Sequence, residues 1–204
     1  MKRALLLYGL MALVIPAAGF AKPPAEAASA ALTNAVILII RHAEKPASGF
    51  GLTPVGDARA KAYVDYFKNY TLGGQTLKLD YIFAAADTQG SHRSRLTVEP
   101  TGQAFGLAVD SRFNDKDVQG QAEEIRSKPH GRAILIAWHH GQIPALLRAL
   151  GADPGKVLPD AKWPDAVYGW VIQLRFDAEG RLADAKCINE HLMPDDAAKP
   201  AENK

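Results

Sequence analysis

The chain has 204 residues, of which 48% are hydrophobic and 23% charged, and this predicts a single domain with a substantial core and excludes a disordered protein. The single cysteine, Cys187, excludes a disulfide framework and a cysteine-rich zinc or iron–sulfur centre. The formal net charge is only +2, so no strong charge balance points to nucleic acid or to an anionic membrane surface as a partner.

The first 21 residues have the layout of a secretory signal peptide. Lys2 and Arg3 form a basic head, residues 4–15 form an uncharged leucine-rich run, and small residues precede the expected cleavage after Ala21. The apolar run is shorter than the roughly 20 residues that span a bilayer, which disfavours a retained membrane anchor. We therefore expect a periplasmic or secreted protein whose mature chain is neutral overall and not stably inserted in a membrane.

Residues 34–193 are expected to form one domain, preceded by an Ala/Pro-rich linker at 22–33 and followed by a flexible polar tail at 194–204. Within this domain the expected elements are, in chain order, a strand at 35–40, a helix at 53–70, a strand at 79–85, a helix at 91–105, strands at 107–110 and 133–137, a helix at 142–150, and a hairpin of strands at 170–176 and 181–188. The runs at 35–40 and 133–137 are continuously aliphatic, as expected for strands buried on both faces of a parallel sheet.

Local signals support the helix boundaries. Thr53 and Pro54 are typical N-cap and first-turn residues, and Gly151 is typical of the position just beyond a helix. Pro100 predicts a kink or a restart within the second helix. Because helices alternate with buried strands, the sequence predicts a three-layer α/β/α sandwich with a mostly parallel sheet.

Both aliphatic strands deliver histidines at their carboxyl ends. The first strand leads into Arg41 and His42, and the strand at 133–137 leads into His139 and His140. In a parallel sheet these strand ends lie on the same rim, where ligands bind. A single histidine is more often structural, but two at matching strand ends, one of them beside an arginine, favour a functional site.

Two arginines indicate that this rim binds anions. Arg41 follows six apolar residues, so its guanidinium must meet a carboxylate or an anionic ligand. Arg93 lies at the start of the second helix, where free backbone N–H groups also favour anions. Because arginine binds phosphate oxygens in a bidentate manner, the combination predicts a phosphate pocket.

Four motifs in order resemble the histidine phosphatase (phosphoglycerate mutase-like) superfamily. They are Arg41-His42-Ala43-Glu44, Leu52-Thr53-Pro54-x-Gly56, Arg93-x-x-x-Thr97-x-Glu99-Pro100, and His139 followed by Ile143-Pro144-Ala145-Leu146. Each motif alone is a weak signal, but the four together cover residues 36–150. The resemblance implies a phosphoglycerate mutase-like fold.

The resemblance also implies residue roles for a phosphatase that hydrolyses phosphomonoesters through phosphohistidine. His42 is then the nucleophile, while Arg41, Arg93 and His139 bind the phosphoryl group of a small-molecule or phosphoprotein substrate. No metal or cofactor is required, because side chains supply the positive charge. The second ring nitrogen of His42 needs an orienting partner, which the sequence does not identify.

Several assignments depend on the exact motif register. Arg95 lies two residues after Arg93, nearly on the opposite helix face, so it is expected to be solvent-facing or structural. His140 occupies a position where one branch of the family carries an acid, which leaves the proton donor open. The other branch places a glutamate between the second Arg and the second His. Here that interval offers Asp117 as the proton-donor candidate, with Asp115, Glu123 and Glu124 as alternatives.

The sequence leaves other functional hypotheses open. The same cluster could make a non-catalytic periplasmic protein that binds a metal ion through His42, His139 and His140, although the two arginines oppose a bound cation. It could also bind a phosphorylated ligand without turnover. Beyond the four motifs, Trp163 and Tyr168 either wall the substrate pocket or pack in the core. Glu44 has no assigned role.

Overall fold

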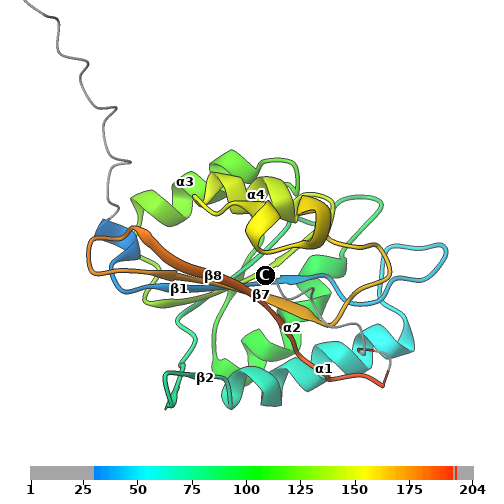
Figure 1. Cartoon of the computed structure of the whole chain (residues 1–204). Helices are drawn as coiled ribbons and strands as arrows, with labels where there is room; N and C mark the ends of the chain where they lie inside the picture. Colours follow the sequence, from blue (N-terminus) through cyan, green and yellow to red (C-terminus); the bar gives the residue numbers. More distant parts are fainter. Residues whose placement is uncertain (1–29, 195, 197–204) are drawn as a thin grey trace, which may run out of the picture.

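The computed structural model describes residues 30–194 and 196 (Figure 1). The predicted signal peptide, most of the predicted linker and all of residues 197–204 lie outside the described residues. Within the described part, the helices are too short or too polar to cross a lipid bilayer.

The main elements match the predicted alternation of strands and helices. The strands of the large sheet are β1 (Val36–Arg41), β4 (Tyr81–Ala84), β5 (Val109–Asp110), β6 (Ala133–Trp138), β7 (Trp170–Phe176) and β8 (Leu182–Asn189). The α-helices are α1 (Pro54–Lys68), α2 (Arg93–Phe105), α3 (Val118–Ser127) and α4 (Ile143–Ala149). The short 3-10 helices are η1 (Ala30–Leu32), η2 (Pro154–Lys156) and η3 (Pro159–Ala161).

The sheet has six strands in the order β5-β4-β6-β1-β7-β8. The four strands from β5 to β1 are parallel, and the β7–β8 hairpin is added antiparallel to β1. In the pairing of β1 with β6, Arg41 lies opposite Trp138. The carboxyl ends of these two strands are therefore level, so the residues that follow them emerge side by side.

Helices cover both faces of the sheet, which confirms the predicted mostly parallel sandwich. Figure 1 shows α3 and α4 on one face and α1 and α2 on the other. The side chains of β1 alternate between two cores: Ile37 and Ile39 belong to the core that includes Ile125 of α3, and Leu38 belongs to the one that includes Phe67 of α1. This double burial explains why the β1 run is continuously aliphatic rather than alternating.

The helix signals in the sequence are reflected in the structure. Thr53 is the N-cap of α1, and its hydroxyl oxygen accepts a hydrogen bond from Gly56 N at 3.1 Å. Helix α2 continues through Pro100 as one element rather than restarting there. Helix α4 ends at Ala149, two residues before Gly151.

The structure also contains elements that the sequence patterns do not predict. Helix α3 is absent from the predicted elements, and so is the hairpin of β2 (Thr71–Leu72) with β3 (Gln75–Thr76), which turns through Gly73 and Gly74 at positive φ. The predicted linker also needs correction, because its Leu32 is fully buried in the core within η1. The packed domain thus begins before residue 34.

Candidate active site

The level ends of β1 and β6 bring the predicted histidines together. The ring of His42 lies 5.7 Å from that of His139 and 6.2 Å from that of His140, measured between centroids. The backbone N–H of His42 continues the sheet by donating to the carbonyl of Trp138 at 3.0 Å. The rim predicted from the sequence is therefore a real cluster of three imidazoles.

His42 is held in one orientation by the backbone. Its Nδ1 lies 2.8 Å from the carbonyl oxygen of Ala43, and because a carbonyl only accepts, Nδ1 carries the proton. The other nitrogen, Nε2, is buried and has no hydrogen-bond partner among the described residues, so it presents a lone pair. Burial, reinforced by the nearby cations Arg41 and Arg93, lowers the pKa of His42 to about 3. Ala43 O is thus the orienting partner that the sequence did not identify.

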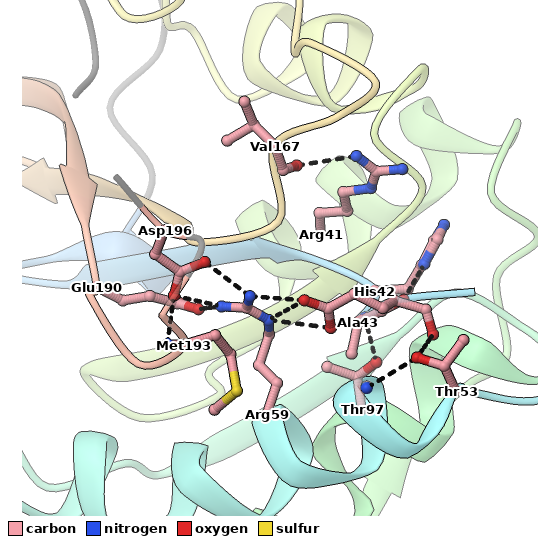
Figure 2. A network of polar contacts seen from close by, with 12 residues as sticks. Arg41, His42, Ala43, Thr53, Arg59, Thr97, Val167, Glu190, Met193 and Asp196 are labelled. Atoms are coloured by element: carbon pink, nitrogen blue, oxygen red, sulfur yellow. Dashed lines mark hydrogen bonds and ion pairs between the residues drawn. The ribbon is translucent and has the colours of Figure 1, made fainter. Parts of the chain in front are cut away.

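Arg41 is 1% exposed and is fixed by the loop that precedes β7. One terminal guanidinium nitrogen, Nη1, donates to the carbonyl of Asp165 at 2.6 Å. It also donates to the carbonyl of Val167 at 2.8 Å (Figure 2). The guanidinium carbon lies 3.8 Å from the ring centroid of Tyr168. The Nε–H group of Arg41 is buried without a partner in the described structure. Neutral carbonyls therefore hold Arg41 and leave one buried donor available.

Arg93 is the first residue of α2 and shows the same pattern. Its Nη2 donates to the carbonyls of Gly49 at 2.8 Å and Gly90 at 3.2 Å, while its buried Nε–H has no described partner. Thr97, one turn later, accepts from Ala43 N at 2.8 Å and donates to the carbonyl of Arg93 at 2.7 Å. Thr97 thereby ties the start of α2 to the loop that carries His42.

Arg95 is placed differently from Arg93, as the helical spacing predicts. It forms ion pairs with Asp87 at 2.9 Å and with Glu99 at 3.1 Å. These carboxylates occupy its guanidinium, which fits a structural role on the surface of α2.

His139 and His140 follow β6 directly and differ in their hydrogen bonds. His139 Nδ1 accepts a long hydrogen bond of 3.3 Å from Gly141 N. His140 Nε2 lies 2.8 Å from Asp165 Oδ1, so Nε2 carries the proton and the buried Nδ1, which has no described partner, presents a lone pair. Burial lowers the pKa of His139, and burial together with Arg41 and His139 lowers that of His140 to about 4.

The structure gives the proton-donor candidate Asp117 a different role. Asp117 is exposed and is the N-cap of α3, where its Oδ1 accepts from Gly120 N at 3.0 Å. Asp115, two residues earlier, interacts electrostatically with His139. The Asp115 carbonyl accepts from Trp138 Nε1 at 2.9 Å, which ties this loop to the end of β6. Asp115 is therefore an acid of this interval that interacts electrostatically with a histidine of the site.

The remaining two acids of the interval have other surroundings. Glu124 is paired with Arg112 at 2.9 Å and with Lys128 at 2.8 Å. Glu123 is exposed on α3. Within the part of the chain that the structure describes, neither forms a hydrogen bond or an ion pair with His42 or His139.

Glu44, which has no assigned role in the sequence analysis, belongs to a second buried cluster centred on Arg59. Arg59 is 2% exposed, and its guanidinium contacts Glu44 at 2.6 Å, Asp196 at 2.7 Å, and also Glu190 (Figure 2). Burial raises the pKa of Glu190 to about 7. Asp196 lies in the predicted tail, so the packed structure extends beyond residue 193.

The second motif serves this cluster rather than the histidines. Thr53 N donates to the carbonyl of Glu44 at 2.9 Å. A Cβ on Gly56 would lie 2.6 Å from the same carbonyl oxygen, so only glycine allows α1 to approach this closely. Thr53 and Gly56 thus position the chain that follows His42.

The aromatic residues beyond the motifs separate into a core residue and a wall residue. Trp163 is 3% exposed, packs in the core, and donates from Nε1 to the carbonyl of Val167 at 2.8 Å. Tyr168 is half-buried, with its ring centroid 6.3 Å from that of His42. Tyr168 also lines a cavity of about 560 Å³ together with Glu44, Val55 and Arg59. Tyr168 therefore borders both the histidine cluster and this neighbouring cavity.

No protein-family model matches the chain, and no curated protein sequence matches it. The chain is similar in structure to phosphoglycerate mutase from Plasmodium falciparum, with a TM-score of 0.51 and 19% sequence identity over 84% of this chain and 98% of that one. The fold is therefore of the phosphoglycerate mutase-like class, which confirms the predicted resemblance at the level of the fold.

Two further solved structures are similar over comparable lengths. One is named as the phosphohistidine phosphatase SixA from Agrobacterium tumefaciens, with a TM-score of 0.49 and 17% identity over 74% of this chain and 97% of that one. The other is a phosphoserine phosphatase from Entamoeba histolytica, with a TM-score of 0.49 and 12% identity over 74% of this chain and 96% of that one.

Proposed function

We propose that this protein hydrolyses phosphomonoesters through a phosphohistidine intermediate on His42. One observation carries the proposal: three buried nitrogen atoms of neighbouring residues lack hydrogen-bond partners in the described structure. They are Nε2 of His42, Nε of Arg41 and Nε of Arg93. A buried polar group without a partner is costly, so such a set indicates a missing ligand.

The chemistry of these three atoms fits a phosphoryl group. The two Nε–H groups are cationic donors that suit phosphoryl oxygens, and the Nε2 lone pair is a nucleophile that suits phosphorus. The guanidinium groups are already held by loop carbonyls, so they need little reorganisation when negative charge develops during transfer. His139, on the same rim, is a third side chain, after the two arginines, that can bind the phosphoryl group.

The reaction would proceed in two displacements. In the first, Nε2 of His42 attacks phosphorus, the bond from phosphorus to the ester oxygen breaks, and the departing alkoxide takes a proton from an acid. In the second, water attacks phosphorus, the N–P bond breaks, the proton of the water returns to the acid's conjugate base, and inorganic phosphate leaves. Positioning and charge stabilisation supply most of the catalysis in such transfers.

We assign the acid to Asp115 in place of Asp117. The side chain of Asp117 is engaged in capping α3, whereas Asp115 interacts electrostatically with His139. Asp115→Asn should reduce turnover of substrates with poor leaving groups by about 10²-fold or more, because proton transfer typically contributes that much. Turnover of an aryl phosphate, whose leaving group needs less protonation, should fall much less in this variant. Equal losses of turnover for both kinds of substrate would argue against this role of Asp115.

The hydrogen bonds of His42 also favour a second candidate function. The protein could bind a phosphorylated ligand without turnover, because none of the described carboxylates hydrogen-bonds to His42. Binding alone predicts that phosphate or vanadate raises the melting temperature of the wild-type protein while no aryl phosphate is hydrolysed. Hydrolysis that disappears in His42→Ala excludes this candidate.

Export is part of the proposal and rests on the N-terminal sequence. The basic head and the short apolar run predict processing near Ala21 and a periplasmic or secreted location. The intact mass of protein recovered from a cell-envelope fraction should correspond to a chain without residues 1–21. A cytosolic pool that retains those residues would contradict the proposed location.

The proposed activity is tested with the purified mature chain and a generic aryl phosphate in the presence of a chelator. The wild-type protein should turn over and His42→Ala should not, while His191→Asn, which changes an exposed histidine and keeps a residue type that tolerates its positive φ, should match the wild type. Turnover that the chelator abolishes, or that survives in His42→Ala, would contradict the mechanism. A panel of phosphomonoesters would then identify the substrate class.

A further inference from the structure

The three histidines of the site also form a possible set of metal ligands. One nitrogen from each of His42, His139 and His140 lies within 4.8 Å of the other two. We propose that this set binds a zinc-class divalent transition-metal ion, and that the bound ion inhibits the protein by occupying the lone pair of His42. The inhibitory consequence rests on the proposed function, whereas the binding does not.

Two of the three histidines each keep one unprotonated ring nitrogen. His42 donates Nδ1–H to the carbonyl of Ala43, and His140 donates Nε2–H to the carboxylate of Asp165. The remaining nitrogens, Nε2 of His42 and Nδ1 of His140, are both buried and both without a described partner. Each of these two nitrogens presents an unprotonated lone pair, which is the form of histidine that binds a metal ion. The rings that carry them lie 6.2 Å apart, measured between centroids.

The outer contacts match those of metal-binding histidines. Such histidines usually donate their second ring N–H to a backbone carbonyl or to a carboxylate, which fixes the tautomer and raises the basicity of the ligating nitrogen. His42 and His140 each have one of these two partners. His139 is less constrained, because its hydrogen bond with Gly141 N is 3.3 Å long, so its ring can change tautomer or turn at small cost.

The geometry requires only a modest contraction. Zn–N bonds of about 2.0–2.1 Å in a tetrahedral site separate ligand nitrogens by about 3.4 Å. The observed separations of at most 4.8 Å must close by roughly 1.4 Å or less. His139 and His140 begin the loop between β6 and α4 and are half-buried, which leaves them room to move toward the buried His42.

The charged residues around the three histidines determine the expected affinity for a metal ion. Arg41 and Arg93 oppose a cation in this place, while Asp165 and Asp115 favour it. We therefore expect binding in the micromolar range rather than the much tighter binding of structural zinc sites. Phosphate and the metal ion should compete, because both require Nε2 of His42.

The binding is tested by titrating Zn²⁺ into the chelator-treated mature chain and measuring heat. The wild type should bind one ion per chain, and His140→Ala should bind at least 10-fold more weakly. Asp165→Asn should also weaken binding about 10-fold, and its side chain is 93% exposed, so this variant retains the fold. His191→Asn, at an exposed histidine outside the cluster, is the matched control and should bind as the wild type does.

The outcomes separate this inference from the proposed function. Zinc binding that persists unchanged in both His140→Ala and Asp165→Asn, or that is lost in His191→Asn, would overturn the inference, as would no binding at all. If zinc binds as expected but no phosphomonoester is hydrolysed, the proposed function fails and the metal site stands. If both hold, Zn²⁺ inhibits the wild type, and a chelator restores the full rate.

Discussion

Two buried arginines, Arg41 and Arg59, show how the same side chain serves two purposes in one small domain. Arg59 meets three carboxylates, and each of its guanidinium nitrogens donates to at least one of them. Arg41 meets only carbonyl oxygens and an aromatic ring, and its Nε–H stays without a described partner. A buried cation that the protein neutralises itself is structural, whereas one that it leaves unneutralised belongs to a site for an anion.

The two clusters are adjacent along the chain. Arg41 ends β1 and His42 follows it, and Glu44, two residues after His42, enters the Arg59 cluster. The Arg59 cluster thus joins the loop after His42 to α1 and, through Glu190 and Asp196, to the segment after β8. We infer that it fixes the backbone from which His42 projects.

The largest expected effect is on the stability of the Arg59 cluster. Arg59→Met should lower the free energy of unfolding by about 3–5 kcal/mol, because it leaves two buried carboxylates, Glu190 and Asp196, and the partly buried Glu44 without their cation. Urea denaturation measures the loss, with Arg112→Met as the control because that arginine is more than half exposed. A loss below about 1 kcal/mol would show that the cluster is not structural.

Arg93→Ala should act on turnover instead of stability. Loss of a preorganised donor to the transition state typically costs about 10²–10³ in rate, or about 2.7–4 kcal/mol. Arg95→Ala, two residues along α2, should keep most of the activity because its guanidinium is paired with Asp87 and Glu99. Steady-state kinetics of both variants provide the comparison, and similar losses in the two would refute the assignment of Arg93 to the phosphoryl group.

Glu190 gives the Arg59 cluster a predictable pH dependence. Its pKa is raised to about 7 by burial, so between its ordinary pKa near 4.5 and pH 7 the folded protein binds more protons than the unfolded chain. Its contribution to stability is therefore complete below about pH 4.5 and is lost as the pH rises toward 7. The free energy of unfolding of the wild type should fall by about 1–3 kcal/mol relative to Glu190→Gln over this range.

Denaturation of both proteins at several pH values measures this difference directly. If the difference in free energy of unfolding between the wild type and Glu190→Gln does not change with pH, Glu190 titrates normally. The converse sign, with the wild type gaining relative stability as the pH rises, would mean that Arg59 holds Glu190 ionised.

The smallest expected effect concerns Asp117. Asp117→Ala should lower stability by about 0.5–2 kcal/mol, because it removes the cap of α3, and should leave turnover unchanged. Thermal denaturation and steady-state kinetics check the two halves. A large loss of turnover with normal stability would restore Asp117 as the proton donor and displace Asp115.

The parts of the fold that the sequence predicted are those with a dense local signal. The double-sided burial of β1 and β6 leaves an uninterrupted aliphatic run, and the Thr53-Pro54 pair marks the start of α1. The sequence does not predict helix α3, because that segment is mostly polar, and it offers the helix cap, Asp117, as a catalytic candidate. An N-cap and an active-site acid use the same residue type, so sequence alone does not distinguish them.

The site was predictable only in part for a similar reason. Arg41, His42, Arg93 and His139 follow strand ends or open a helix, which places them by topology alone. The backbone partner of His42 and the pairing of His140 with Asp165 arise from loops that have no periodic pattern. Arg59 could have been noticed as a charge on the inner side of α1, but two of its three carboxylate partners come from 131 and 137 residues away.

The central claim is that His42 is the nucleophile, and rapid quenching during turnover of a ³²P-labelled phosphomonoester tests it most directly. The wild-type chain should carry label on His42 through a bond that survives base and breaks in acid, as expected for phosphohistidine and not for a phosphoserine ester. His42→Ala should carry none, His140→Ala should still be labelled, and a chelator should leave labelling unchanged. Label on any other residue, or turnover by the wild type without any phosphoenzyme, would contradict the claim.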